Sequence, residues 1–356
     1  MKEIPIIETR ARLRTWLTLC YALFIVYVSL SPFTGWREQG LNFADMLDMP
    51  LRLTFTTFEA TLNFFAYLPF GLLICLALRG RFSTTTSVIS ALCIGMLLSA
   101  CMEYLQMYLP TRTSSNMDLL SNTTGTLAGA LLAARMTSHT WFIAQLAYWR
   151  SSLFHHGKEM DFGLALLVLW MFVQVNPSLP MLGNVFISEV ARQPFVKLPP
   201  SPFDWWESTA VALNLLMLGT MMLTLLRTQR NTASALLAII SMVAAAKFLA
   251  AALLLKSWAL LLWINSEAML GILAGMLLLL AVLRLPRNAA IAFGAIAALS
   301  YIAIVNFVLD RNTPSAAASI YHWHYRHLLN YNGLAQTITL AFPILLLFHL
   351  WRVRKV

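Results

Sequence analysis

The amino-acid sequence predicts an all-α, polytopic integral membrane protein with about ten transmembrane helices and both termini in the cytoplasm. Of its 356 residues, 59% are hydrophobic and 11% are charged, whereas soluble domains carry about 25% charged residues. Apolar runs of about 20 residues, long enough to span a bilayer as a helix, recur along the chain. Because backbone polar groups in lipid must bond within the chain, each run is expected to be helical.

The apolar runs indicate where the spanning helices lie and how they are grouped. They fall near 15–31, 60–78, 84–109, 117–136, 161–176, 208–226, 232–255, 258–283, 288–309 and 334–351. The grouping predicts a four-helix membrane domain over residues 1–140, a cytoplasmic linker over 141–160 and a six-helix membrane domain over 161–356.

The basic residues set the predicted orientation. With the N-terminus inside, the inner segments hold about twice as many Lys and Arg residues as the outer segments, as the positive-inside rule requires. Both termini are therefore expected in the cytoplasm, and the family resemblance given below implies the bacterial cytoplasmic (inner) membrane. Since the loops and termini account for the net charge of +10, no nucleic-acid partner is expected.

A polar hairpin connects the apolar runs 84–109 and 117–136. Glu103 and Gln106 lie one turn apart near its start, and Asp118 and Asn122 lie one turn apart after it. A short connection makes the two helices antiparallel neighbours, so these four side chains are expected to converge. Ionisable residues at membrane depth are costly and indicate a functional site.

Two of these residues are candidate catalytic groups. Glu103 and Asp118 could act as an acid–base pair, because two carboxylates in a low-dielectric pocket separate in proton affinity. The candidate ligand-binding residues are Asn63, Gln106, Arg112 and Asn122. Arg112 could hold a phosphate through its guanidinium group. The alternative is an internal polar clasp that only fixes the hairpin.

Three histidines in the last outer loop, His322, His324 and His327, have a spacing that could suggest zinc. On a helix, however, only His324 and His327 share a face, and no Cys or carboxylate lies within ten residues, so no metal is expected. The chain also lacks a P-loop, a dinucleotide-binding glycine turn, a nucleophile elbow and a zinc-protease motif. No cofactor is therefore expected.

Two charged residues of the C-terminal half, Lys247 and Glu267, are expected at membrane depth. A buried ion pair between them is the simpler interpretation. A coupling-ion or proton site, which would make this half a transporter, is the alternative.

The spacing of the polar residues resembles that of the VanZ-like family over about residues 15–136. The resemblance is carried by the patterns Asn63-x5-Pro69-Phe70-Gly71, Glu103-x2-Gln106-x3-Pro110-x-Arg112 and Asp118-x3-Asn122-x2-Gly125-x3-Gly129. Residues 326–334 and Phe342-Pro343 resemble the C-terminal region of longer, Gram-negative members. The family is named for a membrane protein associated with low-level resistance to teicoplanin, and it has no established reaction.

Three functions are therefore open. The first is a cell-envelope factor whose outward-facing polar pocket engages a membrane lipid, a lipid-linked cell-wall precursor or a glycopeptide, with a contribution to glycopeptide resistance implied by the resemblance. The second is an integral-membrane enzyme acting on a lipid or polyprenyl phosphate, and the third is a transporter. The sequence leaves open whether the chain forms a homo-oligomer.

Overall fold

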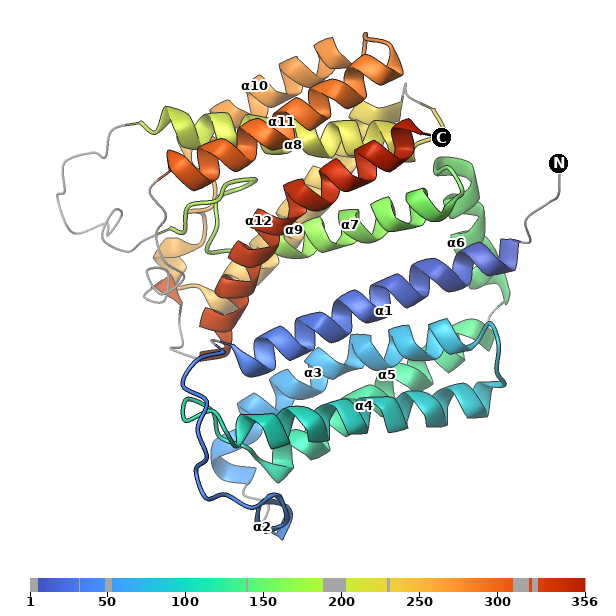
Figure 1. Cartoon of the computed structure of the whole chain (residues 1–356), viewed down its shortest axis with the longest axis vertical. Coiled ribbons are helices and arrows are strands. Elements are labelled where there is room, and N and C mark those ends of the chain that lie inside the picture. The colour runs from blue at the N-terminus through green and yellow to red at the C-terminus, as the bar shows by residue number, and fades with distance from the viewer. Residues whose placement is uncertain are drawn as a thin grey trace. The chain divides into compact units, whose positions relative to one another are not determined.

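A computed structural model (Figure 1) describes most of the chain as helices. The described residues are 6–31, 33–48, 53–138, 140–187, 203–228, 231–309, 320–321 and 326–355. Within these ranges no strand is present, apart from two isolated β-bridges. The all-helical prediction is confirmed. The chain divides into two compact units, residues 1–151 (the front unit) and 152–356 (the rear unit).

The front unit is built around the contact between two helices, α3 and α5. Its helices are α1 (Ile6–Leu30), α2 (Phe43–Asp48), α3 (Leu53–Leu78), α4 (Thr84–Gln106), α5 (Asn116–Ser138) and α6 (Thr140–Leu153), whose last residues cross into the rear unit. Helices α1 and α4 pack on this pair. A Cβ at Gly125 would strike the backbone of Phe64, and one at Gly129 would strike that of Leu68. These glycines therefore let the backbones of α3 and α5 approach closely.

The rear unit is arranged around α8, most of whose side chains are buried. Its helices are α7 (Lys158–Gln174), α8 (Trp205–Leu225), α9 (Thr232–Leu254), α10 (Ser266–Val282), α11 (Arg287–Phe307) and α12 (Arg326–Arg354), with a short 3₁₀ turn, η3 (Ser257–Ala259). Helices α10 and α11 pack on α8, and α12 packs on α7 and α11 (Figure 1). Residues 175–187 follow α7 as an irregular and largely buried segment.

Seven helices in the described part of the chain are long and apolar enough to cross a membrane. They are α1, α3, α4, α8, α9, α11 and α12. Of the other expected spans, α7 and α10 have 17 residues each, and α5 is not apolar enough to be among the seven. The polytopic helical class is confirmed, whereas the count of ten spans and the cytoplasmic location of both termini stay predictions.

The expectation of one helix over 258–283 was wrong. Helix α10 begins only at Ser266, because the Asn265 side chain caps it by accepting a hydrogen bond from the backbone N–H of Ala268 at 2.8 Å. The segment 141–160, expected as a linker, is mainly helix α6, which begins at Thr140.

Candidate functional site

Glu103, near the end of α4, is almost completely buried, with 3% of its surface exposed. Its Oε2 atom accepts hydrogen bonds from the backbone N–H of Ser115 at 2.9 Å and from the Ser114 hydroxyl at 3.1 Å. Both donors lie just before α5. The carboxylate therefore fastens the end of α4 to the start of α5, as the clasp alternative expects.

Asp118 lies in the first turn of α5, where the helix dipole favours a negative charge. The Asn63 side chain of α3 lies beside its carboxylate, and the charge of Glu59 acts on the same group. The charge of Asp118 in turn acts on Glu103. The structure thus brings Asn63, Glu103 and Asp118 together.

Asn122 lies one turn after Asp118 and is 5% exposed. Its amide nitrogen donates to the Ser99 hydroxyl of α4 at 2.9 Å, while its Oδ1 atom has no hydrogen-bond partner. Tyr67 of α3, 4% exposed, interacts electrostatically with Glu103 and Asp118. Ser99 lies near the Tyr67 hydroxyl, but the Tyr67 oxygen has no hydrogen bond of acceptable geometry to any described residue. Two buried polar atoms beside the carboxylates therefore have unused bonding capacity.

Together these residues form what we call the front cluster: Glu59, Asn63, Tyr67, Ser99, Glu103, Asp118 and Asn122. Sequence reasoning missed Tyr67 and Ser99, since neither is charged and both lie in apolar runs. Their spacing was the available signal. Tyr67 follows Asn63 by four residues and Ser99 precedes Glu103 by four, so each extends an existing polar face by one helical turn.

Gln106 and Arg112, the other two predicted ligand-binding residues, turn to α1 instead. The Gln106 amide donates to the carbonyl of Ser29 at 3.0 Å. The Arg112 guanidinium donates through Nη2 to the carbonyls of Val28 at 2.6 Å and Ser31 at 2.9 Å. Carbonyls in the last turn of a helix lack partners within it. Both side chains therefore cap α1, and the structure does not bring them to the carboxylates.

A groove runs between α3 and α5 at the level of this cluster. It has a volume of about 470 Å³ and an open, mostly apolar lining. The lining residues are Ala60, Thr61, Phe64, Phe65, Met117, Leu120, Ser121 and Thr124. Phe64 follows Asn63, and Met117 precedes Asp118. The groove, called the front groove below, therefore lies on the same helix pair as the Asn63–Asp118 contact.

The rear unit contains its own buried polar cluster, around Lys247 of α9. This side chain has no exposed surface. Its ammonium donates to the backbone carbonyls of Asn176 and Leu179 at 2.8 Å each, and of Pro180 at 3.4 Å. Glu267 instead accepts from its neighbour Ser266 at 2.9 Å. The expected Lys247–Glu267 ion pair was wrong, because Lys247 turns to the irregular segment after α7.

Asn332 of α12 completes the rear cluster, which comprises Asn176, Ser178, Lys247, Tyr321 and Asn332. Its Oδ1 atom accepts hydrogen bonds from Asn176 at 2.9 Å and from Ser178 and Tyr321 at 3.0 Å each. Burial raises the pKa of Tyr321 to about 12, so its hydroxyl stays a donor at neutral pH. The segment after α7 is thereby joined to Tyr321 and to α12, more than 140 residues later in the sequence, through one oxygen atom.

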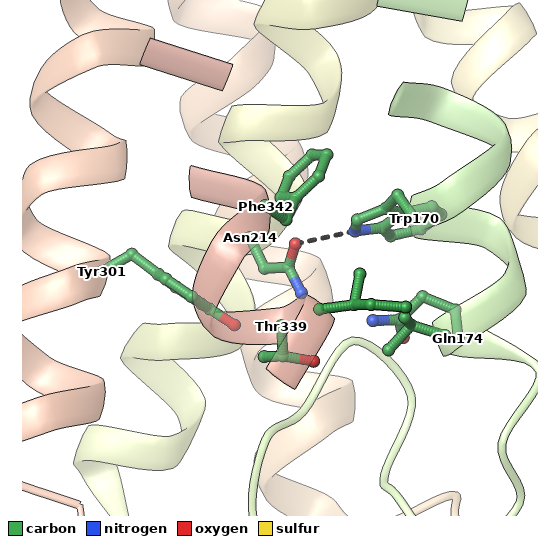
Figure 2. Close-up of a pocket in the computed structure, with 8 residues that line it drawn as sticks. Trp170, Gln174, Asn214, Tyr301, Thr339 and Phe342 are labelled. Atoms are coloured by element: carbon green, nitrogen blue, oxygen red, sulfur yellow. Dashed lines mark hydrogen bonds between the residues drawn. The ribbon is translucent and has the colours of Figure 1, made fainter. Parts of the chain in front are cut away.

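A small cavity lies in the rear unit (Figure 2) between α7, α8, α11 and α12. Asn214 lies among its lining residues, with its oxygen turned to the Trp170 indole N–H at 3.0 Å and its nitrogen donating to the Leu182 carbonyl at 2.9 Å. The Thr339 hydroxyl has no hydrogen-bond partner among the described residues. The volume of about 10 Å³ is close to the minimum for one water molecule.

The three histidines of the last predicted outer loop are not tested by the structure. His322 and His324 lie outside the described residues, as does the side chain of His327. Among the residues that are described, no group of three metal-ligating side chains occurs. The absence of a metal stays a prediction.

Residues 11–138 match the model of the VanZ/LLP1 family. This part of the chain is similar to the VanZ/LLP1 family. The match includes the whole front cluster and ends within the front unit, so it does not extend to the rear unit. The seven long apolar helices in the described part of the chain, together with this similarity, indicate an integral membrane protein. No curated protein and no solved structure matches the chain.

Proposed function

We propose that the VanZ-like unit binds an amphiphilic molecule of the bacterial cell envelope and thereby contributes to glycopeptide (teicoplanin) resistance. The ligand class comprises membrane lipids, lipid-linked cell-wall precursors and glycopeptide-type antibiotics. The protein would act in the inner membrane, with the front cluster facing outward.

The front groove is the observation that carries this proposal. Its volume of about 470 Å³ falls in the range of ligand pockets, about 300–1,000 Å³. Phe64, Phe65 and Met117 suit an acyl or polyprenyl chain, and Thr61 and Ser121 also line the groove. The Asn63–Asp118 contact on the same helix pair offers polar groups to the other end of the ligand.

Two other functions have less support. An enzyme using Glu103 and Arg112 would need both side chains at the substrate. The Glu103 carboxylate, however, is held by Ser114 and Ser115, and Arg112 is held by α1. A transporter using Lys247 as a coupling charge would have to release it from three backbone carbonyls.

Filling the front groove tests the proposal. Thr61→Trp places a large side chain in the groove, and Thr85→Trp places the same side chain at an exposed site on α4. We expect Thr61→Trp to reduce the amount of co-purifying lipid about tenfold, a loss of about 1.4 kcal/mol. It should also lower the teicoplanin concentration that a complemented deletion strain tolerates. The proposal would be contradicted if Thr61→Trp and Thr85→Trp retained equal amounts of lipid and supported growth at equal teicoplanin concentrations.

A further inference from the structure

We infer that the front cluster receives a protonated amine, and that the occupant of the front groove is an aminophospholipid of the surrounding membrane. This rests on the proposed function and specifies the chemistry of its ligand. The inference draws on charge, on unused hydrogen-bonding capacity and on the position of the groove.

The first argument is charge. The cluster contains three carboxylates, from Glu59, Glu103 and Asp118, whose charges interact. Within the described part of the chain, none of the three forms an ion pair with a Lys or Arg side chain. The Nη2 atom of Arg112, the basic residue of the hairpin, is directed to the carbonyls of α1. Acidic groups at membrane depth normally pair with a cation or with backbone groups. Glu103 already bonds to Ser114 and Ser115, so a ligand cation would complete the site at Asp118.

The second argument is the pair of buried oxygen atoms without partners. The Asn122 Oδ1 atom and the Tyr67 hydroxyl both lie in the cluster, each on a side chain more than nine-tenths buried. A buried polar atom left unsatisfied is destabilising, because it has lost its hydrogen bonds to water and gained none in the protein. Both oxygens can accept a hydrogen bond, as can the Asp118 carboxylate.

An ammonium group matches these acceptors. It has three N–H donors and no acceptor, which equals the number of acceptors offered by Asp118, Asn122 and Tyr67. A phosphate group offers only acceptor oxygens and negative charge, and it would be repelled by Glu103 and Asp118. The charge of the cluster therefore favours an amine as the end of the ligand that enters it.

The third argument is position. The front groove and the Asn63–Asp118 contact involve the same two helices, α3 and α5. An amphiphile with its amine at Asp118 can lay its acyl chain along Phe64 and Met117. Charge complementarity at one end and an apolar wall at the other together favour an aminophospholipid over a free amine.

The test compares head groups on the wild-type full-length chain. The protein is placed in lipid nanodiscs containing equal amounts of phosphatidylethanolamine, its N-acetylated form and phosphatidylglycerol, all with the same acyl chains. Native mass spectrometry then measures which lipid stays bound. We expect at least about tenfold preference for phosphatidylethanolamine, equivalent to about 1.4 kcal/mol. Because this comparison needs no variant, misfolding cannot imitate the result.

Variants link the preference to the cluster. Asp118→Asn should remove the preference, while Asp48→Asn, an exposed acid on α2, should keep it. Equal retention of all three lipids by the wild type would overturn the amine inference and leave the proposed function standing. If the wild type retained none of the three lipids, and Thr61→Trp matched the wild type in lipid retention and teicoplanin tolerance, both the amine inference and the proposed function would be overturned. A preference that survives Asp118→Asn would also overturn the inference.

Discussion

The two buried polar clusters differ in how fully their hydrogen-bonding groups are used. In the rear cluster the Lys247 ammonium reaches three backbone carbonyls, and the Asn332 Oδ1 atom receives three donors. In the front cluster the Tyr67 hydroxyl and the Asn122 Oδ1 atom have no partner, and Asp118 lacks a basic partner in the described part of the chain.

This difference separates a structural core from a candidate binding site. Both clusters contain charged residues that the sequence places at membrane depth, so burial of charge does not distinguish them. Unused capacity does, because an unsatisfied buried group is costly unless a ligand or water completes it. The rear cluster fixes the irregular segment 175–187 between helices, whereas the front cluster keeps two buried acceptor atoms without a partner among the described residues.

The largest effect should come from breaking the rear cluster. Lys247→Met removes the ammonium and leaves the carbonyls of Asn176, Leu179 and Pro180 without this donor. We expect a loss of unfolding free energy on the order of 3 kcal/mol, measured by thermal unfolding in detergent. Lys158→Met, at an exposed position at the start of α7, is the matched control and should change stability by less than about 0.5 kcal/mol. Equal melting temperatures for the two variants would show that the rear cluster is not structural.

An intermediate effect should separate the two carboxylates of the front cluster. Glu103→Ala removes the acceptor for Ser114 and Ser115 and should cost about 2 kcal/mol, as for a hydrogen bond to a charged group. Asp118→Asn keeps an oxygen for Asn63 and should cost less than about 1 kcal/mol while abolishing lipid preference. Thermal unfolding of both variants in detergent measures these two losses of stability. If Asp118→Asn is the more destabilised of the two, Asp118 belongs to the clasp rather than to a ligand site.

The smallest effect should come from the rear cavity. The Thr339 hydroxyl has no protein partner there, so Thr339→Val removes only a group that one water could satisfy. We expect a change within about 0.5 kcal/mol. Asn214→Leu, by contrast, removes the acceptor of Trp170 and the donor to the Leu182 carbonyl and should cost more in the same assay. A Thr339→Val loss as large as that of Asn214→Leu would indicate that this cavity, too, holds a ligand.

The sequence predicted much of the front unit for physical reasons. Apolar length defined the helices, and the polar turn after Pro110 marked the hairpin that joins α4 to α5. The helical phase of Asp118 and Asn122 placed them on one face, and both now lie in the front cluster. That the side chains of Gln106 and Arg112 bond to α1 could not be predicted, because helical phase does not say which neighbouring helix a polar face contacts.

The rear unit was less predictable, also for physical reasons. The partners of Lys247 are backbone carbonyls of an irregular segment, and no side-chain pattern encodes them. The stretch before Asn265 consists of η3 and turns but is as apolar as an α-helix, containing Trp258 and Trp263, so hydropathy could not reveal the break. In the sequence, Asn265 is simply an Asn within an apolar run, and the run itself does not mark it as the start of a helix.

The central claim is that the front cluster is completed by a ligand and the rear cluster is not. An electron cryomicroscopy structure of the protein in nanodiscs made from its native membrane lipids tests this most directly. We expect non-protein density within hydrogen-bonding distance of the Tyr67 hydroxyl and the Asn122 Oδ1 atom, continuous with a chain along the front groove, and none at Lys247. An empty front groove, with Tyr67 and Asn122 bonded to protein groups, would contradict the claim.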